Sequence, residues 1–241
     1  MVVVAGMHWD KLEEKEIEEV IAICQKLKDK DTRGGKGKLK RIIVGITGAS
    51  GVIYGIRLLE ALKDLGIETH LVLTEAAKKN ILLETTFTPE DVEGLASHVY
   101  NVDDLAAPIS SGSFKTDGMV ITPCTIKTLS GVAHSYNENL LIRAADVTVK
   151  ERRRLILIVR ETPLHKGHIE LMLKVTELGG IILPPIPAVY HSPRMIEDLI
   201  DHTIGKVLDI MGVEHSLYKK WEGVNKIQKK VFTNMVEHEI A

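Results

Sequence analysis

Two loops of the sequence combine small residues and hydroxyl groups in a way that suits ligand binding. The first runs Thr47-Gly48-Ala49-Ser50-Gly51-Val52-Ile53-Tyr54-Gly55, and the second runs Pro123-Cys124-Thr125-Ile126-Lys127-Thr128. Glycines permit tight turns and close backbone approach, and the amides at a helix start bind anions. The first loop lacks the Gly-Lys-Ser/Thr of a Walker loop and the dinucleotide spacing, which argues against ATP hydrolysis. It suits an anion or the edge of a cofactor ring, with helix packing alone as the alternative.

Charged residues follow in a second group. Arg143, Lys150 and the run Arg152-Arg153-Arg154 precede an apolar stretch, which Arg160-Glu161 closes. A run of charges usually marks a solvated face, but charges at the carboxyl end of a strand lie where ligands bind in α/β proteins. We therefore give Arg160 and Glu161 more weight as functional residues than the preceding run.

Metal and thiol chemistry receive less support. The pair His165 and His168 has no nearby carboxylate to complete a zinc site, and a helix cap is the simpler interpretation. Asp103-Asp104 lacks the further acidic residue of a Mg²⁺-diphosphate site. Cys124 has no evident base beside it and is expected to be a buried small residue. We expect any phosphate to meet Arg and Lys, with no metal.

A repeating order of strands and helices positions these loops. Apolar stretches typical of buried strands cover residues 41–47, 69–73, 118–122, 155–159 and 180–183. Helical spacing of apolar residues covers 52–64, 75–83, 127–133, 169–177 and 193–212. Strands that are apolar throughout and alternate with helices predict an α/β fold with a doubly wound parallel sheet in three layers. In that fold, ligands bind beyond the carboxyl ends of the strands.

Composition narrows the class of protein. The chain has 241 residues, of which 44% are hydrophobic and 27% charged, and a net charge of −2. These values indicate a globular protein and favour binding neither to nucleic acid nor to a membrane. Two cysteines and the absence of a signal-like start lead us to expect a cytoplasmic protein. Residues 1–39 are expected to form a helical arm with a basic linker, 40–221 the main domain and 222–241 a polar tail.

Several motifs together resemble the UbiX/Pad1 flavin prenyltransferases. They are Gly48-Ala49-Ser50-Gly51, Leu83-Glu84-Thr85, Ser110-Ser111-Gly112-Ser113, Pro123-Cys124, Arg143-Ala144-Ala145-Asp146-Val147, Lys150-Glu151-Arg152-Arg153, Arg160-Glu161-Thr162-Pro163-Leu164 and Tyr190-His191. The resemblance covers about residues 40–221, with every motif in order. It implies a flavodoxin-like (Rossmann-type) subunit that binds reduced FMN and dimethylallyl phosphate, without a metal, and joins the five-carbon unit to flavin N5 and C6.

The resemblance also implies roles for individual residues. FMN would contact Gly48, Ala49, Ser50, Thr74, Ser111, Thr125, Ile126, Lys127, Thr128 and Arg143. The allyl phosphate would be held by Lys150, Arg160, Glu161, Tyr190 and Lys206, from neighbouring subunits of a homo-oligomer that is a dodecamer in this family. Lys206 replaces the arginine usual in the family, and a lysine cannot reproduce the bidentate fork of a guanidinium.

The chemistry suggests further assignments. Cleavage of the allylic C–O bond develops negative charge on the phosphate and positive charge on the five-carbon fragment. Lys150, Arg160 and Lys206 can stabilise the first, and Trp221 with the flavin ring the second. Glu161 is a candidate acid for the leaving phosphate. Ser50 and Glu84 are candidates for a proton relay at flavin N5.

Rival functions remain open at the level of sequence. The product, prenylated FMN, would pass to a decarboxylase of the UbiD type. One alternative is an FMN-dependent decarboxylase of the phosphopantothenoylcysteine type, although Pro123-Cys124-Thr125-Ile126-Lys127-Thr128 departs from the Pro-Ala-Ser-Ala-Asn-Thr loop of those enzymes. The other is a non-enzymatic FMN-binding module, which would not need Arg160-Glu161.

Overall fold

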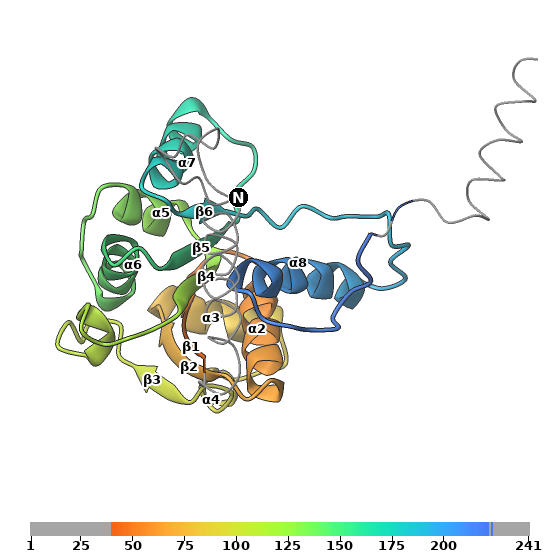
Figure 1. Cartoon of the computed structure of the whole chain (residues 1–241), viewed down its shortest axis with the longest axis horizontal. Helices are drawn as coiled ribbons and strands as arrows, with labels where there is room; N and C mark the ends of the chain where they lie inside the picture. Colours follow the sequence, from red (N-terminus) through yellow and green to blue (C-terminus); the bar gives the residue numbers. More distant parts are fainter. Residues whose placement is uncertain (1–39, 222, 224–241) are drawn as a thin grey trace, which may run out of the picture. The chain divides into compact units, whose positions relative to one another are not determined.

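Strands and helices alternate along the chain in the computed structural model, which describes residues 40–221 and 223 (Figure 1). The predicted arm 1–39 and, apart from Gly223, the predicted tail 222–241 lie outside the described residues. The strands are β1 (Arg41–Ile46), β2 (Glu68–Leu73), β3 (His98–Tyr100), β4 (Gly118–Cys124), β5 (Arg154–Val159) and β6 (Ile181–Ile182). The helices are α2 (Val52–Asp64), α3 (Glu75–Glu84), α4 (Pro89–Glu93), η2 (Pro108–Ser110), α5 (Ile126–Ala133), α6 (Leu140–Lys150), α7 (Lys166–Glu177) and α8 (Ile196–Met211).

All six described strands run parallel in the order β3-β2-β1-β4-β5-β6. The chain builds outward from β1 through β2 to β3, then returns to the other side of β1 and builds outward again from β4. This reversal confirms the predicted doubly wound parallel sheet. It also creates a topological switch point between β1 and β4, where the loops after the two strands diverge and ligands bind in such folds.

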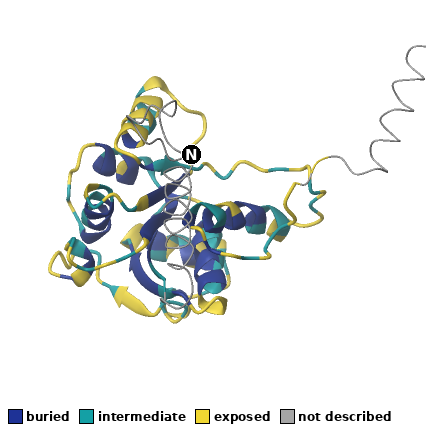
Figure 2. Ribbon diagram, viewed as in Figure 1, coloured by how far each residue is buried: buried dark blue, intermediate teal, exposed yellow. Residues whose placement is uncertain are grey.

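Two apolar clusters, one on each face of the sheet, form the core. One joins Ile42, Val44 and Ile46 of β1 to α2, α3 and α8. The other joins Ile43 of β1 to α5, α6 and Val175 of α7. Figure 2 shows the buried sheet between these helical layers. Both faces are covered, so these central strands need apolar residues on both sides, which explains their continuous hydrophobic runs.

The structure describes four elements that were not predicted from the sequence, namely α4, η2, α6 and β3. Helix α6 buries Leu140, Leu141, Ala144, Ala145 and Val147 and carries its charged residues on the other side. Strand β3 is short and largely exposed at the edge of the sheet. Among the described helices, none is long and apolar enough to span a membrane.

Candidate functional site

Thr47, which follows β1, links the two loops that diverge at the switch point. Its buried hydroxyl donates to the Pro123 carbonyl at 2.7 Å and accepts from the Thr125 amide at 2.9 Å. One side chain therefore joins the loop after β1 to the loop after β4. This fixes the two predicted ligand-binding loops side by side at the carboxyl edge of the sheet.

Two glycines shape the first loop. Gly51 is the N-cap of α2 and has φ = 95°, a conformation that favours glycine. A Cβ on Gly48 would lie 2.2 Å from Cβ of Ala76, in the first turn of α3. The loop can therefore lie against α3 only because residue 48 has no side chain, and this close approach leaves the exposed Ser50 at the mouth of the switch point.

Glu84 is brought to the same loop from the last turn of α3. Its Oε2 accepts from the Gly51 amide at 2.7 Å and from the Val52 amide at 3.3 Å. These amides begin α2 and have no partner within the helix, and a helix N-terminus favours negative charge. The structure thus places Glu84 beside the residue that follows Ser50, so the two predicted relay residues lie on one loop surface.

Hydroxyl groups cap the next two helices at this edge. The Thr74 hydroxyl accepts from the Ala77 amide at 3.2 Å at the start of α3. The Thr125 hydroxyl accepts from the Thr128 amide at 3.1 Å and donates to Thr128 Oγ1 at 3.0 Å. Capping fixes the direction of each helix start. The N-termini of α2, α3 and α5 therefore all meet at the carboxyl edge, and they bring together the predicted FMN residues Gly48, Ala49, Ser50, Thr74, Thr125, Ile126, Lys127 and Thr128.

Arg160 and Glu161 follow β5 at the same edge. The Arg160 amide donates to the Cys124 carbonyl at 3.1 Å, which anchors this segment to the end of β4. Both side chains are exposed, and Glu161 Oε1 accepts from the Thr162 amide at 3.1 Å. A guanidinium and a carboxyl group are thus held next to the switch point without being paired to each other in the described contacts.

Tyr190, Lys206 and Trp221 belong to a second group around α8: Lys206 is on the helix, Tyr190 precedes it and Trp221 follows it. The Tyr190 hydroxyl forms a 2.9 Å hydrogen bond with Nε2 of His202, and the Tyr190 and Trp221 rings meet edge to face at 5.7 Å. Lys206 lies on α8 one turn after His202 and is exposed. Burial lowers the pKa of His202, with further contributions from His191 and Lys206. His202 was not predicted as a site residue, although its spacing from Lys206 places the two on one helix face.

A carboxylate of α8 holds the segment that carries Trp221. Asp209 accepts from the Tyr218 hydroxyl at 2.6 Å and from the Lys220 ammonium at 2.7 Å. Burial alone would raise the pKa of Asp209, but these two hydrogen bonds outweigh it and lower the pKa to about 2. Burial and the same carboxylate raise the pKa of Tyr218. The residues directly before Trp221 are therefore fixed to α8.

The remaining predicted residues lie elsewhere in the chain. Lys150 ends α6 just before β5 begins, whereas Arg160 follows the end of β5. The six residues of β5 span about 20 Å, so the two cations lie at opposite edges of the sheet. Arg143 binds the Ser110 carbonyl at 3.2 Å, and Ser111 pairs with Ser113 at 2.9 Å. Within one chain these contacts do not join Ser111, Arg143 or Lys150 to the switch point.

Two structural roles predicted from the sequence, the helix cap at His165 and the burial of Cys124, are confirmed. His165 caps α7 by accepting from the Gly167 amide at 3.1 Å. Cys124 is fully buried, and burial raises the pKa of its thiol, so it is suited to packing and not to nucleophilic attack.

Comparisons with known proteins agree with this arrangement. The flavoprotein family model matches residues 30–221. The flavin prenyltransferase UbiX of Thauera aromatica is 54% identical over 183 residues, which are 76% of this chain and 94% of that protein.

Two solved structures show the same fold. The structure of AnUbiX (PadA1) in complex with FMN and dimethylallyl pyrophosphate has a TM-score of 0.77 and 45% identity, and covers 78% of this chain and 100% of its own. A dodecameric FMN-dependent UbiX-like decarboxylase from Escherichia coli has a TM-score of 0.75 and 46% identity, and the match covers 76% of this chain and 100% of that chain. Because sequence similarity and fold extend over the whole described domain, the chain belongs to the flavoprotein family and, within it, to the UbiX flavin prenyltransferases.

Proposed function

We propose that this chain transfers the dimethylallyl group of dimethylallyl phosphate to N5 and C6 of reduced FMN and releases phosphate. The observation that carries this proposal is the convergence of three helix N-termini and the Gly48 loop at the switch point. Such a surface suits a phosphate-bearing flavin, since amides and hydroxyls bind the phosphate while the loop backbone approaches the ring closely. The reduced flavin supplies the nucleophilic ring atoms, and the protein supplies position and charge.

The residues that hold FMN come from the switch point of one chain and from a second copy of the chain. Gly48, Ala49, Ser50 and Thr74 line one side of the switch point, and residues 125–128 line the other. Arg143 and Ser111 complete the set from a second copy of the chain. Glu84 accepts hydrogen bonds from the amides that begin α2. Together with Ser50 it relays the proton that leaves N5 when the new bond forms.

Cationic side chains stabilise the negative charge of the leaving phosphate. Lys150, Arg160 and Lys206 surround it, Tyr190 donates a hydrogen bond, and Glu161 supplies a proton. Fixed positive charge at the departing group lowers the barrier to breaking the C–O bond because negative charge grows there in the transition state. Trp221, packed edge to face on Tyr190, provides an aromatic face for the positive five-carbon fragment.

The position of Lys150 requires more than one chain. It lies at the amino edge of the sheet, whereas Arg160 lies at the carboxyl edge. A homo-oligomer resolves this separation, because the amino edge of one copy can face the carboxyl edge of another. Exposed apolar side chains on two segments support such assembly: Ile169 and Leu173 on α7, and Ile186, Val189 and Ile196 near the start of α8.

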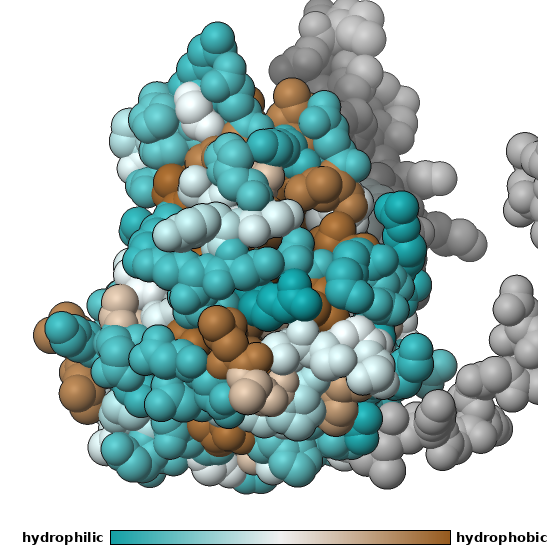
Figure 3. Space-filling model, turned by 90° about the vertical axis from the view of Figure 1, so that its left-hand side faces the viewer, coloured by the Kyte–Doolittle hydropathy of each residue, from teal (hydrophilic) through white to brown (hydrophobic). Residues whose placement is uncertain are grey.

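We infer a dodecamer, the assembly named for the Escherichia coli relative. Figure 3 shows apolar groups interrupting the hydrophilic surface on the side of the molecule that carries α6. We further propose a cytoplasmic location and a UbiD-type decarboxylase as the recipient of the product. A chain with two cysteines suits a reducing compartment.

The test is incubation of the full chain with reduced FMN and dimethylallyl phosphate, followed by mass spectrometry. A five-carbon gain in FMN mass supports the proposal, and a parallel reaction with the diphosphate identifies the preferred donor. FMN that binds but stays unchanged would favour a non-enzymatic FMN-binding module. Decarboxylation of an aromatic or cysteinyl acid with no second enzyme present would favour a decarboxylase such as the phosphopantothenoylcysteine type.

A further inference from the structure

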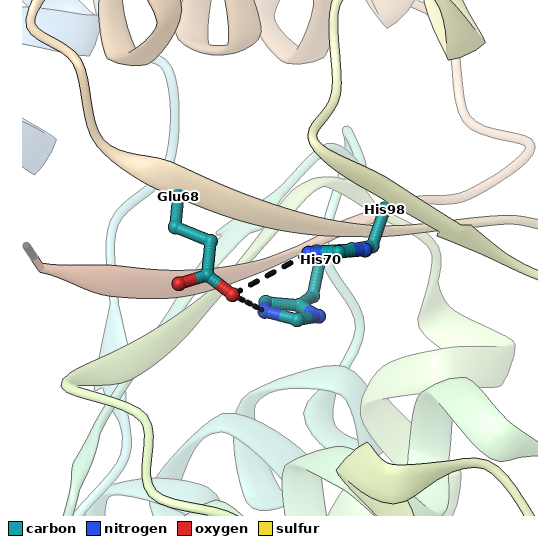
Figure 4. A group of neighbouring side chains, drawn as sticks. All are labelled: Glu68, His70 and His98. Carbon is teal, nitrogen blue, oxygen red and sulfur yellow. Dashed lines mark hydrogen bonds and ion pairs between the residues drawn. The ribbon is translucent and has the colours of Figure 1, made fainter.

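Glu68, His70 and His98 gather on one face of the sheet at its β2–β3 edge (Figure 4). His70 and His98 are register partners on the two parallel strands, so their side chains project side by side. Glu68 lies two residues before His70, and residues two apart on a strand share a face. The backbone pairing therefore brings two imidazoles and one carboxylate together.

The donor atoms are spaced as ligands around one ion. Oε1 of Glu68 lies 3.0 Å from Nε2 of His70 and 3.5 Å from Nε2 of His98. One ligand atom from each residue lies within 4.8 Å of the other two. Two ligands at zinc bond lengths and tetrahedral angles lie about 3.4 Å apart, so small rotations suffice to close this set around an ion.

The surroundings hold His70 and leave His98 free to adjust. Nδ1 of the buried His70 forms a 2.9 Å hydrogen bond with the Tyr100 hydroxyl, and Phe114 packs edge to face on its ring at 5.1 Å. Metal-binding histidines usually engage their second ring nitrogen in this way. The His98 ring stacks on His70 at 4.7 Å and is half exposed, so it can turn toward an ion and leave one coordination position to solvent.

Arg41 limits the affinity of this group for a cation. Its Nε donates to Oε1 of Glu68 at 2.9 Å, and its guanidinium lies 4.7 Å from the centre of the Phe114 ring. A carboxylate has two oxygens with about four acceptor positions, so Glu68 can keep Arg41 and still bind an ion. The neighbouring positive charge of Arg41 repels a bound cation and weakens its binding. We therefore expect micromolar rather than nanomolar affinity.

We propose that Glu68, His70 and His98 form a binding site for a divalent transition metal ion of the zinc class. Two imidazoles and one carboxylate are the ligands of many zinc sites that keep an open position, whereas Mg²⁺ and Ca²⁺ prefer oxygen ligands. The site lies on the amino-terminal half of β2, whereas the Gly48 loop follows the carboxyl end of β1. The ion therefore takes no part in the proposed prenyl transfer, and the site stands independently of that proposal.

The experiment titrates the chelator-treated full chain with Co²⁺, whose visible absorption reports its ligands, and then displaces Co²⁺ with Zn²⁺. We expect one saturable site with micromolar affinity. His98→Ala and Glu68→Gln should weaken it about tenfold or more. His168→Ala is the matched control, since His165 and His168 form another close imidazole pair, with ring centres 3.5 Å apart, and it should titrate as the parent does.

Melting temperature separates metal binding from folding. Zn²⁺ should raise the melting temperature of the parent and of His168→Ala, but not of His98→Ala, because an ion that binds only the folded state stabilises it. His98 is exposed, so its replacement should leave the ion-free melting temperature nearly unchanged. Absence of saturable binding up to millimolar metal, or equal binding by His98→Ala and the parent, would overturn the proposal. The three residues would then be only a hydrogen-bonded network around Arg41.

Discussion

The two edges of the sheet use polar residues in opposite ways. At the carboxyl edge, Thr74, Thr125 and Glu84 bond to helix N-termini, and the neighbouring Ser50 and Arg160 side chains stay exposed. At the amino edge, charged groups are tied to fixed partners. Arg41 pairs with Glu68, Arg153 donates to the Gly112 and Phe114 carbonyls, and Arg154 donates to the Met211 carbonyl.

This difference teaches where substitutions should act. Carboxyl-edge groups orient helices and leave donors for a ligand, so their loss should reduce activity more than stability. Amino-edge groups, together with the adjoining end of α8, hold loops and helix ends to the sheet, so their loss should reduce stability first. Two amino-edge residues are exceptions: Lys150 belongs to the proposed phosphate site, and the exposed His98 belongs to the proposed metal site.

Of the substitutions considered, Glu84→Gln at the carboxyl edge should reduce activity most strongly. Glutamine can still accept the Gly51 and Val52 amides but cannot take up the proton from N5, so turnover should fall about 100-fold or more with stalling before or at the first bond. Single-turnover kinetics and melting temperature provide the measurement. Glu75→Gln, at the other end of α3, should keep full activity. Parental turnover in Glu84→Gln would remove Glu84 from the relay.

Gly48→Ala should weaken flavin binding and destabilise the fold. The added Cβ lies 2.2 Å from Cβ of Ala76, so the loop must move, at a cost of about 1–3 kcal/mol. Flavin titration and unfolding at matched protein concentration measure the two effects. Gly94→Ala is the control, since Gly94 has φ = −66° and its nearest contacts would lie at 3.4 Å. Equal flavin affinity in Gly48→Ala and the parent would show that the close approach is not needed.

Asp209→Asn should lower stability. The pKa of Asp209 falls from 3.8 to about 2 on folding. A lowered carboxyl pKa stabilises the folded state above about pH 4, and this contribution is lost as the pH falls toward 2. The shift corresponds to about 2 kcal/mol.

Urea unfolding of the parent and Asp209→Asn at several pH values measures this contribution. The variant should be less stable at neutral pH, and the difference should shrink between pH 4 and pH 2. Asp64→Asn, on α2, is a control for the loss of one charge. A constant difference between the parent and Asp209→Asn across that range would contradict the assignment.

Lys206→Arg should have the smallest effect, and it should improve substrate binding where the other substitutions reduce activity or stability. A guanidinium can bind a phosphate with two parallel hydrogen bonds, whereas an ammonium acts as a point charge. We expect KM for dimethylallyl phosphate to fall several-fold while kcat stays similar, as measured by initial rates. Lys219→Arg tests for a general effect of arginine on the surface. An unchanged KM would show that Lys206 does not contact the phosphate.

Much of the fold could be predicted from sequence because central strands and major helices carry strong apolar patterns. The continuous runs of β1, β2, β4 and β5 are confirmed, as is the doubly wound order. Strand β3 was missed because a three-residue edge strand needs no apolar run. Helix α6 was missed because Arg143 and Lys150 were interpreted as part of a charge run, although its buried face is apolar.

The site could be predicted only in part, for a similar reason. Glycines and hydroxyls mark the loops after β1 and β4, and these loops do meet at the switch point. The contact between Tyr190 and His202 depends on how the segment after β6 packs on α8, which no local pattern encodes. The Glu68, His70 and His98 group likewise depends on strand register. The separation of Lys150 from Arg160 follows from topology, once β5 is placed between them.

Co-expression of Lys150→Ala and Arg160→Ala chains tests most directly whether opposite edges of two copies complete one site. Each variant alone should be nearly inactive in prenyl transfer to reduced FMN. Mixed oligomers should recover activity at roughly a quarter of their sites, because random mixing sometimes joins an intact amino edge to an intact carboxyl edge. If mixed oligomers that are shown to contain both chains stay as inactive as either variant alone, both residues act within one chain and the account is contradicted.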